Sequence, residues 1–77
     1  MVGENKELTI GEKAVGIGFN PGGNPDVHKV KELYAEIIDL LHRLEEESTE
    51  AGRMVDHAIR EAQTAQMWAV KVITWKK

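Results

Sequence analysis

The 77-residue chain contains no cysteine, which removes disulfide bridges and thiolate metal sites as ways of holding it together. A single domain of this length lies near the lower limit for folding alone. It therefore needs either very close helix packing or a partner chain. The lack of cysteine also suits a reducing, intracellular environment.

Long apolar runs are also missing. The longest, residues 67–75, is interrupted by Lys71 and Thr74 and is too short to cross a bilayer. The first residues, MVGENKELTIGEK, carry charges throughout and include no apolar stretch of signal-peptide length. These features predict a soluble protein without a membrane partner.

An excess of positive charge is absent as well. The net charge is −3, which argues against tight binding to a nucleic-acid polymer, because clustered Lys and Arg supply that affinity. Residues 25–50 hold three bases and eight acids, whereas residues 51–77 hold five bases and two acids. Segments of opposite charge would attract each other along an antiparallel hairpin.

Catalytic and metal-binding patterns are sparse. Ser48 is the only serine and has no evident base near it in the sequence. No His-Glu-x-x-His pattern occurs, and His28, His42 and His57 are not at ligand spacing. We therefore expect neither an enzyme nor a bound metal or other cofactor.

The glycines gather at the start of the chain, where six of the seven lie within the first 23 residues. This composition predicts a loop-rich arm with short extended pieces over 6–10 and 13–17. Asn24 is a preferred N-cap, Pro25 suits the first helical position, and Asp26 suits the positive end of the helix dipole. The sequence thus predicts an N-terminal arm with a loop over 1–24 and a helical hairpin over 25–77.

Two heptad patterns follow. In the first helix apolar residues alternate steps of four and three, at Val30, Tyr34, Ile37, Leu41 and Leu44. The acidic segment 45–50 has no apolar anchor and two N-cap candidates, so the turn is predicted there. The second helix repeats the pattern at Ala51, Val55, Ala58, Ala62, Ala65, Ala69 and Val72, beside a second stripe at Ile59, Gln63, Gln66, Val70 and Ile73. The fold class is therefore all-α, an antiparallel hairpin with helices at about 25–47 and 49–75.

The end of the second helix, 67–75, is apolar around nearly its whole circumference. A helix of this kind is buried on all sides, and one partner helix cannot cover it. Leaving Trp68 and Trp75 in water would cost several kcal/mol at roughly 25 cal/mol per Å². We therefore expect a homo-oligomer.

The glycine-rich run 16–23 has two interpretations. It is not a phosphate-binding P-loop, because Pro21 takes the place of a required glycine and no Gly-Lys-Ser or Gly-Lys-Thr follows. The simpler interpretation is a flexible turn in which Phe19 pins the arm onto the hairpin. In the other, backbone N–H groups approach an anion at the helix start and Phe19 stacks on a base.

Two groups of basic residues have similar alternatives. His28, Lys29 and Lys31 lie in the first turns of the first helix, where they are either solvated or neutralised by a bound anion. On the second helix a 4-3-4 spacing places several polar residues on one face, namely Arg53, His57, Arg60 and Thr64. This face is either a salt-bridged surface or, near a symmetry axis, a shared anion pocket.

Parts of the chain resemble the phage anti-CBASS and anti-Thoeris sponge proteins, which share a helical-hairpin domain. The resemblance covers about residues 16–75 and rests on three stretches: 18–21 with 24–27, 35–41, and 61–71. Its most specific parts are the aromatic-x-Pro loop at Phe19 and the Ala-x-Met-Trp-Ala block that ends at Ala69.

The resemblance implies a hexamer that sequesters cyclic nucleotide messengers in the cytoplasm of an infected bacterium without cleaving them. Cyclic dinucleotides, or cyclic ADP-ribose isomers, would lie between paired protomers against the loop residues Phe19, Asn20 and Pro21. One basic side chain from the first helix would also contact the ligand, and three residues are candidates for that role: His28, Lys29 and Lys31. Cyclic trinucleotides would occupy a separate pocket at Arg53, His57 and Arg60, with Arg53 as the best match.

An interaction module is the rival interpretation. In it, the tryptophan-rich end of a small oligomeric helical bundle docks another protein without any nucleotide. The two interpretations differ on whether nucleotides bind at Phe19.

Overall fold

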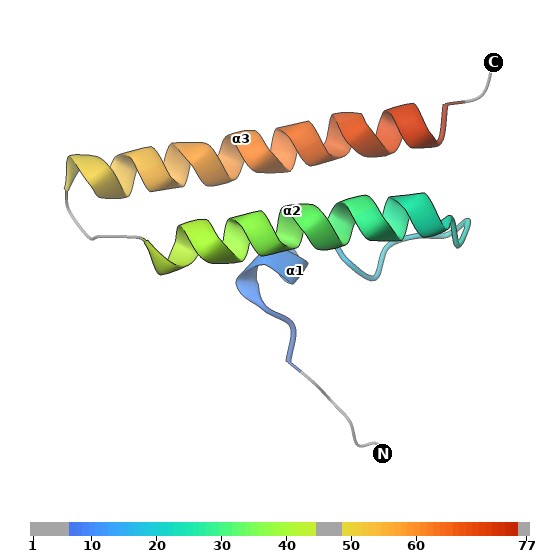
Figure 1. The fold of residues 1–77 in the computed structure, drawn as a ribbon, viewed down its shortest axis with the longest axis horizontal. Coiled ribbons are helices and arrows are strands. Elements are labelled where there is room, and N and C mark those ends of the chain that lie inside the picture. Colours follow the sequence, from blue (N-terminus) through green and yellow to red (C-terminus); the bar gives the residue numbers. More distant parts are fainter. Residues whose placement is uncertain (1–6, 45–48, 76–77) are drawn as a thin grey trace.

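The computed structural model describes residues 7–44 and 49–75. These residues form three helices, α1 (Ile10–Val15), α2 (Pro25–Arg43) and α3 (Glu50–Ile73), and no strand. The long helices α2 and α3 lie antiparallel, and the short α1 packs on α2 (Figure 1). The predicted all-α class is confirmed.

The helix ends follow capping chemistry. The Asn24 side chain accepts hydrogen bonds from the N–H groups of Asp26 and Val27 at the start of α2. The Thr49 side chain accepts from Gly52 at the start of α3. Both helices are shorter than the predicted spans, and most of the predicted turn, 45–48, lies outside the described residues.

The arm contains a helix where the sequence analysis predicted extended pieces, so that prediction is wrong over 13–17. Thr9 and Glu12 form a reciprocal capping box, in which each side chain accepts from the other residue's backbone N–H. This Thr-x-x-Glu spacing is a helix-start signal. The helix ends at Val15 and is capped by Gly16, whose φ of 64° is a left-handed conformation that glycine adopts without strain.

The core lies where the three helices meet. It consists of Val15, Ala35 and the fully buried Ile38, against which Ile59 and Ala62 of α3 pack. Gly11 of α1 lies directly on the α2 backbone, and its N–H donates to Asp39 Oδ1 at 2.7 Å. This close approach holds α1 on α2.

The buried faces differ from the predicted heptad faces. On α2 the buried residues are Val27, Lys31, Ala35 and Ile38, whereas Ile37 and Leu44 are about half exposed. The buried face is displaced because α1 and the loop after it cover this side of α2. On α3 the second stripe is the more buried one: Gln66 is 5% exposed and Val72 is 73% exposed.

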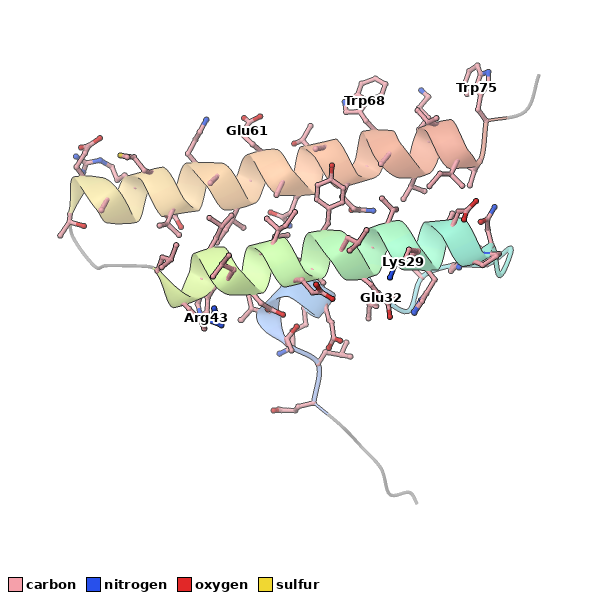
Figure 2. All side chains as sticks on the ribbon, in the orientation of Figure 1. Lys29, Glu32, Arg43, Glu61, Trp68 and Trp75 are labelled. Carbon is pink, nitrogen blue, oxygen red and sulfur yellow. The ribbon has the colours of Figure 1, made fainter. Side chains whose placement is uncertain are left out.

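The outer surface of α3 remains open. Trp68 and Trp75 point away from α2 (Figure 2), and each is 61% exposed. The Lys71 ammonium lies between them, 5.3 Å from one ring centroid and 5.6 Å from the other. Within the described residues, no helix is both long enough and apolar enough to span a membrane.

Candidate functional site: the loop between α1 and α2

The loop over 16–24 is held by its own hydrogen bonds. The Phe19 N–H donates to Gly16 O and the Gly23 N–H donates to Asn20 O, both at 2.9 Å. Asn20 also bonds Asn24 twice: its Nδ2 donates to Asn24 O at 2.9 Å, and its Oδ1 accepts from the Asn24 N–H at 3.3 Å. These bonds close the loop into a defined shape at the start of α2.

Lys31 fixes the loop from α2. Its side chain is buried, with 5% of the residue exposed, and its ammonium donates to Phe19 O at 2.6 Å and to Gly16 O at 3.0 Å. The same ammonium lies 5.4 Å from the centroid of the Phe19 ring, within reach of a cation–π interaction. A buried cation is tolerated because these oxygens replace its hydration.

Next to this loop is a hollow of about 550 Å³. The antiparallel hairpin makes it, because the end of α3 lies beside the start of α2 (Figure 1). One wall is the loop from Phe19 to Gly22 with Asn24, and Val27 and Lys31 come from α2. The opposite wall comes from α3 and the residues that follow it: Val70, Ile73, Thr74 and Trp75. Its size is in the range of small-molecule sites, about 300–1,000 Å³.

The hollow is lined by four of the six residues predicted to bind a cyclic dinucleotide, namely Phe19, Asn20, Pro21 and Lys31. It does not include His28 or Lys29. His28 Nε2 lies 3.3 Å from Glu32 Oε2, an ion pair when the imidazole is protonated. Lys29 projects from the side of α2 opposite α3 (Figure 2) and has no hydrogen bond or ion pair within the described part of the chain.

The start of α2 has little capacity to bind an anion through its backbone. Asn24 Oδ1 takes the N–H groups of Asp26 and Val27, Pro25 has none, and the His28 N–H donates to Asn24 O. The first-turn donors that a phosphate would use are therefore occupied.

The second set of predicted residues lies at the other end of the hairpin. Arg53 and His57 line a shallow depression of about 350 Å³ with Glu50, and Arg60 lies outside it. The Arg53 guanidinium is paired with Glu50 Oε1, and His57 Nε2 lies 3.8 Å from Glu61 Oε2. In one chain this depression is open and its arginine is already paired with Glu50.

The end of α3 was not among the residues predicted to bind a ligand. Val70, Ile73 and Thr74 line the hollow, and the Thr74 hydroxyl donates to Val70 O at 2.8 Å. Their position could have been predicted from the topology, since an antiparallel hairpin places the last turn of one helix beside the first turn of the other. Among the described residues, no three His, Asp or Glu side chains form a group able to hold a metal ion.

The comparisons with known proteins give one family. The model of the Acb2/Tad1 hairpin domain matches residues 12–74, which include the loop, both long helices and most of α1. No curated protein and no solved structure matches the chain. Because the match spans most of the sequence, the chain belongs to the Acb2/Tad1 hairpin-domain family.

Proposed function

We propose that this protein is a sponge that binds and sequesters cyclic dinucleotide messengers, and so blocks antiviral signalling in the cytoplasm of an infected bacterium. The observation that carries the proposal is the exposure of Phe19. This residue is 72% exposed at the edge of the hollow, although an apolar side chain is better buried. A nucleobase stacked on its ring would cover it.

The loop geometry supports the same role. Lys31 and the Asn20–Asn24 bonds hold Phe19 in place before a ligand arrives, which reduces the entropy lost on binding. For the basic residue of α2 that contacts the ligand we propose Lys29, because the Lys31 ammonium already donates hydrogen bonds to two carbonyl oxygens. Lys29 does not line the hollow of its own chain, so it would contact a ligand held between two protomers.

The test of this proposal is the Phe19→Ala variant. Loss of the ring should weaken cyclic-dinucleotide binding by roughly 1–3 kcal/mol in isothermal titration, the range for one base stacked on an aromatic side chain. Ligand recovered after hours of incubation and heat denaturation should be intact and stoichiometric, because a sponge does not cleave what it holds.

Two further variants make this test specific. Phe19→Leu keeps an apolar side chain without an aromatic face and should lose most of the same affinity. Leu8→Ala removes another exposed apolar side chain outside the hollow and should bind as the unaltered protein does. Equal dissociation constants for the unaltered protein and the three variants would mean that Phe19 does not stack on the ligand and only packs within the protein.

We further propose that the chain assembles into a hexamer. The support is the amount of apolar surface that one chain leaves open: a stripe along α2 at Leu33, Ile37, Leu40 and Leu44, with Trp68, Val72 and Trp75 on α3, all at least 45% exposed. Monomeric proteins rarely expose contiguous apolar surface of this kind.

Multi-angle light scattering at micromolar concentration should therefore give about six times the 8.6 kDa chain mass. A folded monomer would contradict the assembly. An oligomer that binds no nucleotide would instead favour the interaction module, whose docking surface would include the outer face of α3.

For the trinucleotide site we propose Arg53, with His57 and Arg60 near it, pooled from several chains around an axis. Arg53→Ala should weaken cyclic triadenylate binding by about 1.5–3 kcal/mol, the range for a hydrogen bond to a charged group, and leave cyclic-dinucleotide binding unchanged. Arg43→Ala removes an arginine at the end of α2, outside this depression, and is the matched control. Loss of both ligands, or of neither, would contradict two separate sites.

A further inference from the structure

On its α2 side, the hollow offers hydrogen-bond donors rather than acceptors, and Asn24 is the main reason. Its Oδ1 accepts from the N–H groups of Asp26 at 2.7 Å and Val27 at 3.2 Å, which uses both lone pairs of that oxygen. The Nδ2 group makes no hydrogen bond within the described residues. Capping α2 thus fixes the orientation of the amide and leaves two N–H donors on a residue that lines the hollow.

On the loop and α2 side, the other polar side chains of the hollow add little accepting capacity; the Thr74 hydroxyl oxygen, which can still accept, lies on the opposite, α3 wall. Lys31 carries three N–H donors, of which two bond Phe19 O and Gly16 O, so that one remains. Asn20 is bonded through both its amide nitrogen and its oxygen to the backbone of Asn24. On the α2 side the available groups are therefore donors.

The hollow is also poorly suited to a phosphate. Its Lys31 charge is shared between two carbonyl oxygens, and the first-turn N–H groups of α2 are occupied. The end of α3 forms the opposite wall, and a helix C-terminus carries partial negative charge that repels an anion. Apolar walls with donors on one side suit the flat face and acceptor edge of a nucleobase.

We propose that the Asn24 amide is a specificity-determining group that selects guanine over adenine, an inference that rests on the proposed function. Guanine presents two neighbouring acceptors, N7 and O6, on one edge. Adenine has the N7 acceptor there, but its N6 amino group is a donor and would face the Asn24 donors unpaired. A site built to hydrogen-bond one group discriminates strongly against an analogue that leaves its polar groups unpaired.

The experiment compares cyclic di-GMP with cyclic di-AMP, which share the same backbone and charge, by isothermal titration of the full chain. The expected result is binding of cyclic di-GMP about ten-fold more tightly, or more. Cyclic di-IMP keeps N7 and O6 but lacks the 2-amino group of guanine, and it should bind as cyclic di-GMP does. Weak binding of cyclic di-IMP, at the level of cyclic di-AMP, would overturn the assignment of this edge.

The variants are Asn24→Ser and Asn24→Asp, which keep a capping oxygen for α2 but remove the amide. Thermal unfolding should stay close to that of the unaltered protein, while the ratio of the two dissociation constants falls towards one. Equal affinities in the unaltered protein, or a guanine preference that persists in both variants, would overturn the inference. If the unaltered protein binds none of these dinucleotides, the proposed function itself fails.

Discussion

Gly11→Ala is expected to detach α1 from α2 and to lower the free energy of unfolding by about 3–5 kcal/mol. A Cβ atom on this residue would lie 2.1 Å from the backbone oxygen of Ala35 and 2.8 Å from its carbonyl carbon. Both atoms belong to the α2 backbone and cannot move aside as a flexible side chain can. Overpacking typically costs about 1–3 kcal/mol, and losing the bond from Gly11 N–H to a carboxylate adds about 1.5–3 kcal/mol.

The measurement is chemical denaturation followed by circular dichroism, with Gly18→Ala as the control. Gly18 has no atom within 4 Å of an added Cβ and has no positive φ, so its substitution should change stability by less than about 0.5 kcal/mol. Similar stability for both variants would mean that α1 does not pack on α2 as described.

Lys31→Met is expected to lower the free energy of unfolding by about 3 kcal/mol and to loosen the loop. Methionine fills similar space, but the Phe19 and Gly16 oxygens lose the ammonium that bonds them. Gly16 O keeps the Phe19 N–H, whereas Phe19 O has no other donor within the described residues. A hydrogen bond to a charged group contributes about 1.5–3 kcal/mol, and two are lost here.

Lys29→Met is the matched control, because it makes the same chemical change two residues away on an exposed position. Its stability should stay within about 0.5 kcal/mol of the unaltered protein. In titrations it should lose cyclic-dinucleotide affinity, because Lys29 is the α2 residue that we propose contacts the ligand. If Lys29→Met unfolds as early as Lys31→Met, the stabilising role assigned to Lys31 is wrong.

The fold class could be predicted from the sequence because the signals for helices are local. Asn24 and Pro25 mark the start of α2, and the apolar spacing marks both long helices. The small helix α1 was missed because six residues hold too few turns for a periodic pattern, and the glycines around it outweighed the capping box at Thr9 and Glu12. Its presence also explains the displaced buried face of α2, since periodicity does not reveal which side a neighbouring segment covers.

The candidate site was predictable in its loop and less so elsewhere. Phe19 stood out as a lone aromatic side chain in a glycine-rich turn. The roles of Lys29 and Lys31 could not be separated, because the bonds from Lys31 to Gly16 and Phe19 join residues 12 to 15 positions apart. Asn24 was assigned only as a helix cap. The structure was needed to see that both hydrogen bonds of the cap go to its Oδ1 and that its Nδ2 makes none within the described residues.

The bonds that close the loop also bear on how fast a ligand is captured. A segment that must become ordered slows association, whereas the loop over 16–24 is already tied by Asn20 and Lys31 before any ligand arrives. For the proposed sponge, encounter with a cyclic dinucleotide would then need no folding step. Such a protein would benefit when it competes with a signalling receptor for a newly made messenger, because the competition is decided by association rates before equilibrium is reached.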